Sequence, residues 1–363
     1  MSILEKKTSL YVTCTTSQDV GKTALCLGLA LKLREEGVNI GYFKPLGWHT
    51  SLEGESLDED TLHMKKILNL EEPLETITPV LLEYQYLDQY STGNTVHLLD
   101  KVTQAYRRVA RDKDLIIIEA LHESCLGASL NLSAADLAKL FGSHLLLLSA
   151  TNRDAAVDEI LFEHFCISQK GTKCSGVIFN RVRNTFGDRI RNVFIPTLEK
   201  QRIQVWGIIP ESTILTAPTV KELVEALGGE VLCGERNLSN QVERYLVGAM
   251  TQDSAIHYFR SAPRKAVITG GDRPDIALAA LETDTSVLIL TGNFYPDVRV
   301  KAKAEERGVP IILVSYDTYN TVEMVRNITG KLRVDDRKRI DEAKRLVSEY
   351  VEWDKLLSYL KVK

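Results

Sequence analysis

The part of the sequence best suited to phosphate chemistry runs from Thr16 to Thr23 and reads TSQDVGKT. Its spacing is that of the phosphate-binding loop G-x-x-x-x-G-K-[ST], with Thr16 at the position of the first glycine. Gly21, after Val20, would let backbone N–H groups approach a polyphosphate. Lys22 would reach the β- and γ-phosphates, and the Thr23 hydroxyl would bind Mg²⁺. The pattern predicts nucleotide binding, although an ordinary strand–turn–helix joint with an exposed Lys22 is the alternative.

Three further charged residues could complete such a site. Lys44 lies between an apolar segment and a Pro-Leu-Gly turn, from which it could project over the same crevice. Glu119 ends the apolar run 115–118, where a Mg²⁺ ligand or a water-orienting carboxylate would lie. Asp60, like Asp58, belongs to an acidic helix start, and a capping box of Ser56 with Glu59 is the simpler explanation for this segment. Lys44 is as readily a surface lysine, and the case for Glu119 depends on the phosphate loop.

A second candidate site reads Gly270-Gly271-Asp272-Arg273, between a predicted buried strand and a helix that begins with proline. The glycines allow a tight turn, and a helix N-terminus favours an anion. Arg273 could pair bidentately with a phosphate or carboxylate. Equally, Asp272 and Arg273 could pair with each other or with a neighbouring subunit and fix the turn. The same sheet edge is expected to carry two polar residues after the last strand, Asp317 and Thr318.

The elements that would position these residues alternate between short apolar runs and longer stretches of helical period. Continuous Val/Ile/Leu strands separated by amphipathic helices predict a mainly parallel sheet covered on both faces. The predicted strands are 10–13, 39–43, 114–119, 144–149, 176–180, 205–209, 265–269, 286–291 and 310–315. The predicted helices are 22–36, 57–68, 95–111, 133–140, 155–169, 187–201, 274–282, 297–307 and 321–329.

The alternation pauses at 213–219 and restarts on a smaller scale, which predicts two α/β domains, at 1–212 and 216–333. A charged helical tail at 334–363 follows. It carries one apolar stripe, and we expect that stripe to stay partly exposed and to support a homo-oligomer together with the second domain. The alternative is that the tail folds back on its own chain. The stripe consists of Ile340, Ala343, Leu346, Val347 and Val351.

The composition argues against some classes of partner and indicates the cellular compartment. The 363 residues include 45 Lys+Arg and 49 Asp+Glu, a net charge of -4, whereas proteins that neutralise nucleic acid carry a basic excess. No apolar run approaches the roughly 20 residues of a membrane span, and the N-terminus has no signal-peptide pattern. The six cysteines are scattered, which indicates reduced thiols. We expect a cytoplasmic protein with no nucleic-acid or membrane partner.

Together these residues resemble the dethiobiotin synthetase-like P-loop family. More closely, about the first 210 residues resemble the N-terminal region of the bacterial phosphotransacetylase family. The unit after them resembles the DRTGG domain that follows that region there. The resemblance implies a P-loop NTPase-type sheet followed by a smaller α/β DRTGG domain. The matching segments are Thr15 with Gly21-Lys22-Thr23, Phe43-Lys44-Pro45, Asp60-Thr61-Leu62, Glu119, Gly176-Val177-Ile178-Phe179-Asn180 and Val267-Ile268-Thr269-Gly270-Gly271-Asp272-Arg273.

The resemblance also implies roles for single residues. Lys22 and Thr23 would hold the phosphates and Mg²⁺, with Asp60 and Glu119 as the carboxylates on the metal side. Lys44 matches the lysine that steadies the carbamate or acyl-phosphate end in the synthetase. Nucleotide-reading positions at strand ends are Asn180 and Glu211, and an effector would bind the DRTGG residues Gly270, Gly271, Asp272, Arg273, Asp317 and Thr318.

Two departures bear on activity. The glycine-rich substrate loop of the synthetase is replaced by the segment 120–124, which argues against dethiobiotin synthesis. The phosphotransacetylase family carries acyl transfer in a third domain, so we do not expect that activity here. The first hypothesis is a regulatory or sensory ATP-binding protein that uses Mg²⁺, hydrolyses ATP slowly if at all, and acts on a separate metabolic enzyme. The alternatives are an ATP-dependent ligase forming an acyl- or carbamoyl-phosphate, with Lys44 and Glu119 as catalytic residues, and a scaffold with a degenerate loop.

Overall fold

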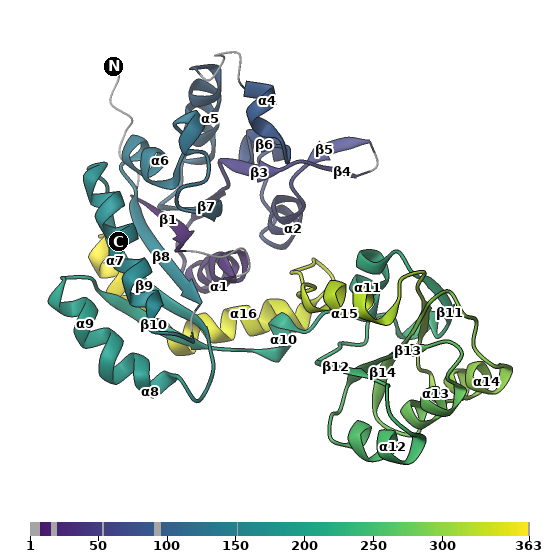
Figure 1. Cartoon of the computed structure of the whole chain (residues 1–363). Helices are drawn as coiled ribbons and strands as arrows, with labels where there is room; N and C mark the ends of the chain where they lie inside the picture. The colour runs from purple at the N-terminus through teal and green to yellow at the C-terminus, as the bar shows by residue number, and fades with distance from the viewer. Residues whose placement is uncertain (1–7, 16–19, 53, 91–95, 151, 362–363) are drawn as a thin grey trace. The chain divides into compact units, whose positions relative to one another are not determined.

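The chain forms two compact α/β units (Figure 1). The computed structural model describes residues 8–15, 20–52, 54–90, 96–150 and 152–361. The first unit comprises Met1–Ser212 together with Leu332–Lys363, and the second comprises Thr213–Lys331. Each is built around its own mainly parallel sheet.

The sheet of the first unit has six strands in the order β10-β9-β8-β1-β7-β2, and every neighbouring pair is parallel. The carboxyl ends of all six therefore lie at one edge, where ligands bind in open α/β sheets. All six strands predicted for this unit are present. Their bounds are β1 (Thr8–Cys14), β2 (Ile40–Phe43), β7 (Leu115–Glu123), β8 (His144–Ala150), β9 (Lys173–Val182) and β10 (Val205–Pro210).

Helices cover both faces of this sheet, which explains why its strands are continuously apolar. Along β7, Ile116 and Ile118 belong to a core with Tyr106 and Phe141, whereas Leu115 and Ile117 face the other side. The first face packs α5 (Val96–Val109), α6 (Ala134–Phe141), α7 (Ala155–Gln169) and α9 (Ile195–Lys200). The second packs α1 (Lys22–Glu35), α16 (Arg337–Tyr350) and α17 (Trp353–Leu360).

The tail of the chain packs on the first unit, so the expectation of a partly exposed apolar stripe is wrong for all of its residues except Ile340, which is half-buried. Ala343, Leu346 and Val347 on α16 are buried, and α16 runs along α1. The approach is close because Gly28 has no side chain: a Cβ there would lie 2.5 Å from the Ala343 carbonyl oxygen. Val351 is also buried, bridging to β10. Apolar surface of the same chain covers the stripe, which no longer argues for self-association through the tail.

A segment of short elements lies between β2 and α5. Only α2 (Glu59–Ile67) corresponds to a predicted element, because the strands here are three residues long and give no apolar run. They pair as β3 (Leu46–Trp48) with β6 (Val80–Leu82), and β4 (Thr50–Leu52) with β5 (Glu55–Leu57). Two short helices complete the segment, α3 (Leu74–Ile77) and α4 (Tyr86–Tyr90).

The second unit has a five-stranded sheet in the order β11-β15-β14-β13-β12, in which β11 alone is antiparallel to its neighbour. Its three central strands were predicted; the edge strands were not. The strands are β11 (Glu230–Cys233), β12 (Arg244–Val247), β13 (Lys265–Gly270), β14 (Thr285–Thr291) and β15 (Ile311–Leu313). The helices of eight or more residues are α11 (Val220–Leu227), α12 (Gln252–Arg260), α13 (Pro274–Leu281), α14 (Val298–Arg307) and α15 (Thr318–Arg326).

Among the described residues, no helix combines the length and the apolar character that crossing a membrane requires.

Candidate functional site

The end of the predicted phosphate loop requires a glycine at position 21. Gly21 precedes α1 in the left-handed region, with φ 83° and ψ 33°. A Cβ there would lie 2.6 Å from Asn180 Nδ2, which itself donates to the Val20 carbonyl oxygen over 2.7 Å. Asn180, at the carboxyl end of β9, therefore holds the loop against the sheet edge. Thr16 lies outside the described residues.

Lys22 is buried in the first turn of α1, with 5% of its surface exposed, so the alternative of a solvated lysine does not hold. Its Nζ donates to the sulfur of Cys14, the last residue of β1, over 3.5 Å. A thiol compensates a buried ammonium only weakly, whereas phosphate oxygens form much stronger charge-assisted hydrogen bonds. The position therefore suits an anion.

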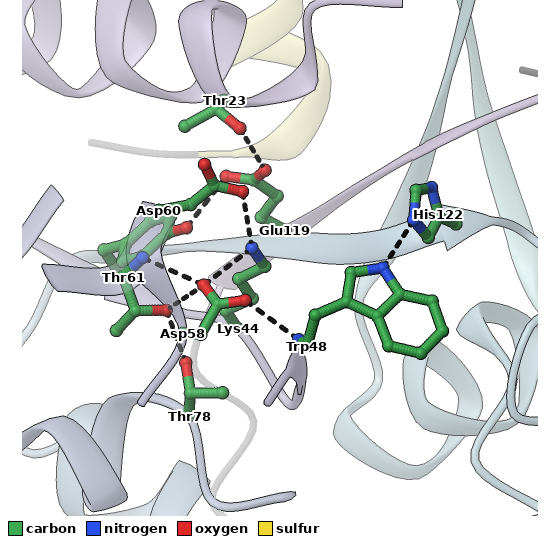
Figure 2. Close-up of polar contacts among 10 residues, drawn as sticks. Thr23, Lys44, Trp48, Asp58, Asp60, Thr61, Thr78, Glu119 and His122 are labelled. Atoms are coloured by element: carbon green, nitrogen blue, oxygen red, sulfur yellow. Dashed lines mark hydrogen bonds and ion pairs between the residues drawn. The ribbon is translucent and has the colours of Figure 1, made fainter. Parts of the chain in front are cut away.

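Glu119 lies directly below Thr23, which follows Lys22 in the first turn of α1 (Figure 2). Its Oε1 accepts from Thr23 Oγ1 over 2.7 Å, and its Oε2 accepts from the Tyr42 hydroxyl over 2.8 Å. Burial raises the pKa of Glu119 above its ordinary value, while Lys44 and the two hydrogen bonds lower it. The strand-end carboxylate and the helix-start hydroxyl are thus brought together as the sequence predicted.

Lys44 forms ion pairs with two carboxylates and is itself 1% exposed (Figure 2). Its Nζ lies 2.8 Å from Asp58 Oδ1 and 2.8 Å from Asp60 Oδ2. Burial lowers the pKa of Lys44, but the carboxylates of Asp60, Asp58 and Glu119 outweigh it and hold the pKa above its ordinary value. Lys44 is therefore a partnered cation within the site and not a surface lysine.

Asp58 anchors this cluster, a role that the sequence did not reveal. It is the N-cap of α2: its Oδ1 accepts from the backbone N–H and the hydroxyl of Thr61, both at 2.9 Å. Its Oδ2 accepts from the Trp48 N–H at 3.0 Å. The N-cap of α2 is thus Asp58 and not the predicted Ser56, and the same carboxylate also holds Lys44. A capping residue in the sequence does not by itself indicate an ion pair with a distant lysine.

His122 and Trp48 form a further contact that sequence reasoning missed. Trp48 Nε1 donates to His122 Nε2 over 2.6 Å, and the two rings lie 5.5 Å apart (Figure 2). His122 belongs to the segment 120–124, which continues β7 beyond Glu119. Its carbonyl oxygen accepts from the Cys14 thiol over 3.3 Å. The segment that replaces the glycine-rich loop is therefore a strand extension packed at this edge.

Glu211 lies apart from this cluster. It follows β10, is exposed, and its N–H donates to the Val182 carbonyl oxygen over 3.0 Å. β10 is the neighbour of β9, so Glu211 and Asn180 end adjacent parallel strands at the same edge. Its contribution to a nucleotide site stays a prediction.

The described residues include no group of three or more His, Cys, Asp or Glu side chains arranged to hold a metal ion. Mg²⁺ seldom needs such a group, because one or two carboxylates together with substrate phosphates and water usually bind it. The Thr23 hydroxyl and the Glu119 carboxylate lie side by side, and Asp60 is paired with Lys44. These oxygen atoms fit the small number of protein ligands that Mg²⁺ needs when phosphates and water supply the rest.

In the second unit, the predicted effector residues have structural contacts. Arg273 pairs bidentately with Asp275, at 3.0 and 2.9 Å, and also donates to the Met250 carbonyl oxygen, so its partner is Asp275 and not Asp272. Gly271 leaves no room for a side chain, because a Cβ there would lie 1.7 Å from the Phe294 carbonyl oxygen. At Gly270 a Cβ would lie 2.4 Å from a carboxylate oxygen of the exposed Asp272 side chain, which could move aside.

The remaining two effector residues lie at the start of α15. Asp317 is its N-cap and accepts from the backbone N–H and side-chain amide of Asn320, at 2.8 and 2.9 Å. The Thr318 hydroxyl lies 2.9 Å from that of Thr291, at the end of β14. The carboxyl edge of the second sheet does gather these residues, and ligand binding there stays a prediction.

Comparison with known families agrees with this architecture. The model of an AAA domain, AAA_26, matches residues 8–219, which is more than half of the chain. The chain belongs to this AAA domain family. A DRTGG domain matches residues 222–328. The two domains fit a nucleotide-binding protein, and the fold is of the P-loop NTPase type followed by a DRTGG domain.

Several curated relatives are named phosphate acetyltransferase. Those of Pseudomonas putida and Synechocystis are each 26% identical, covering 93% and 97% of this chain; that of Escherichia coli is 22% identical over 93%. The chain spans about half the length of these relatives, 50%, 52% and 51% respectively. The predicted resemblance to the N-terminal part of phosphotransacetylase is confirmed.

Similar solved structures include MinD of Aquifex aeolicus, at 14% identity, with coverage of 57% of this chain and 83% of that one and a TM-score of 0.36. The CBS and DRTGG domains of Clostridium perfringens pyrophosphatase match at 20% identity, with coverage of 42% and 68% and a TM-score of 0.29. Scores this low carry no argument about function.

Proposed function

We propose that the first unit binds ATP with Mg²⁺ at the loop that ends in Gly21, Lys22 and Thr23. The observation that carries this proposal is the hydrogen bond between the Thr23 hydroxyl and Glu119, because it places a strand-end carboxylate under the first turn of α1. The buried Lys22 supplies the positive charge beside the same turn. Backbone N–H groups at the start of α1 add donors for the phosphates.

When bound, Mg²⁺ would neutralise phosphate charge, and this chain supplies the oxygen atoms around it. The Thr23 hydroxyl and the Glu119 carboxylate would hold the ion, with Asp60 as a further carboxylate nearby. Asn180 would keep the loop in place through its bond to the Val20 carbonyl oxygen. We place the adenine near Asn180 and Glu211 in this proposal because both residues lie at the same edge of the sheet.

We propose that this binding serves regulation rather than ligase chemistry. A lysine that steadies an acyl-phosphate must offer its ammonium to the ligand, whereas Lys44 is bound by Asp58 and Asp60. The DRTGG domain would bind a second effector. Because the curated relatives are phosphate acetyltransferases, a metabolic enzyme of that kind is the partner we propose. Self-association through the second unit stays a prediction.

Thermal unfolding tests nucleotide binding. A ligand that binds only the native state stabilises it by about 2.7 kcal/mol at 100-fold excess over Kd. We expect ATP with Mg²⁺ to raise the melting temperature, and Lys22→Ala to abolish most of that rise. Lys200→Ala, an exposed charge at the end of α9, is the matched control and should keep the full rise. A wild-type protein that melts at the same temperature with millimolar ATP would favour the scaffold hypothesis.

A further inference from the structure

The first unit contains a cavity of about 650 Å³ that none of the predicted site residues lines. It lies among the β4–β5 hairpin, α2, α3, β6 and the start of α5, and Asp58, Thr61 and Thr78 form part of its wall. Small-molecule sites commonly measure 300–1,000 Å³, so the cavity is large enough for a metabolite.

The polar part of the wall offers hydrogen-bond acceptors. The Thr61 hydroxyl donates to Asp58, because a carboxylate in an ion pair with Lys44 can only accept. The Thr78 hydroxyl, 2.6 Å from that of Thr61, must therefore donate its own proton to Thr61 (Figure 2). Thr78 Oγ1 is left with lone pairs alone, so a ligand that meets it must bring a donor.

The charges around the cavity also favour a cation. Glu75 and Glu83 line it, and in the described part of the chain neither carboxylate forms an ion pair. Lys101 is the one lysine in the lining and offsets only one of these two charges. The rest of the wall combines aliphatic side chains with two polar and two cyclic ones: Leu57, Leu74, Val80, Leu81, Leu98, His49, Ser56, Pro79 and Tyr90.

We propose that this cavity binds a small organic ammonium compound with an aliphatic body, such as an alkyl diamine. Its ammonium groups would donate to Glu75, Glu83 and Thr78, and its methylene chain would lie on the leucine and valine side chains. An inorganic cation would satisfy the carboxylates but leave the aliphatic wall without a partner. No residue of the proposed nucleotide loop lines the cavity, although Asp58 in its wall also holds Lys44, and occupancy of the cavity requires no nucleotide.

Calorimetric titration of the full chain without nucleotide tests this proposal. The probes are 1,5-diaminopentane, pentane-1,5-diol and glutarate, which share five carbons and differ in their end groups. We expect binding of the diamine alone. Absence of diamine binding at millimolar concentration would overturn the proposal, and so would equal binding of the diol or preferential binding of glutarate.

Variants then locate the site. The double variant Glu75→Gln, Glu83→Gln should weaken diamine binding at least about tenfold, because charge-assisted hydrogen bonds are roughly twice as strong as neutral ones. Glu71→Gln, an exposed carboxylate outside the cavity, should leave the affinity unchanged. Thr78→Val should weaken binding by removing the acceptor in the wall. Diamine affinity that is unaffected by the double variant would place the ligand elsewhere and refute the assignment.

Discussion

At the scale of single residues, the site is a set of buried charges that depend on one another. Lys44 forms an ion pair with Asp58, Asp58 caps α2, and Glu119 accepts hydrogen bonds from the hydroxyls of Thr23 and Tyr42. Residue type and position at a strand end made Glu119 and Lys44 candidates, but the case for Glu119 depended on the phosphate loop and Lys44 was as readily a surface lysine. The partnership of Lys44 with Asp58 was not predictable, because it depends on how the segment after β2 folds back over the sheet edge.

Replacing Lys44 tests whether it serves structure. We expect Lys44→Met to lower the free energy of unfolding by about 3–5 kcal/mol, because it leaves the buried Asp58 carboxylate without its counter-ion. Lys66→Met, an exposed lysine on α2, is the control and should change stability by no more than about 0.5 kcal/mol. Denaturant unfolding measures both. Equal stabilities for the two variants would show that Lys44 is free to act on a ligand.

At the scale of elements, the sequence predicted all six strands of the first sheet and the three central strands of the second, and it missed the edge strands of the second sheet and the short strands. Central strands such as β7 and β14 are continuous apolar runs because helices cover both sides. In contrast, β11 and β12 are partly exposed, and β3 to β6 are three residues long, so none of them has a clear apolar pattern. The loop before α1 was recognised because its glycine and lysine carry specific backbone and charge requirements.

Variants at two glycines that share the same φ distinguish backbone strain from close contact at the loop. Gly21 and Gly37 both have φ +83°, but a Cβ would meet Asn180 Nδ2 at 2.6 Å only at Gly21, and nothing within 4 Å at Gly37. We expect both alanine variants to lose about 1–2 kcal/mol of stability from the left-handed backbone. Gly21→Ala alone should also lose nucleotide affinity, measured by titration with ATP. Equal affinities for the two variants would contradict the close packing of the loop on Asn180.

At the scale of the whole molecule, the chain returns to its first unit after completing the second. Residues from Leu332 onward belong to the first unit, and α16 runs along α1, the helix that begins at the phosphate loop. Pattern alone showed an amphipathic tail helix but not what would cover it, since an apolar stripe fits the same chain or a second copy equally well. Gly28 allows the close approach of α16, but the sequence does not reveal this because the neighbour, Ala343, is known only from the structure.

The tail should therefore contribute to the stability of the first unit. We expect Leu346→Ala to lower the free energy of unfolding by about 2–5 kcal/mol, the cost of emptying a buried leucine site. Ser348→Ala, on the exposed face of the same helix, should change it by less than about 0.5 kcal/mol. Unfolding monitored on the intact chain gives both values. Similar small effects from the two variants would mean that α16 is not held against α1.

Direct titration of the purified chain with ATP tests the central claim most sharply. We expect one ATP per chain in the presence of Mg²⁺, weaker binding when EDTA removes the ion, and loss of binding in Lys22→Ala but not in Lys200→Ala. Such a result would place the nucleotide at the first turn of α1, beside Thr23 and Glu119. Unchanged ATP binding in Lys22→Ala, or no binding by the wild-type chain, would contradict the account.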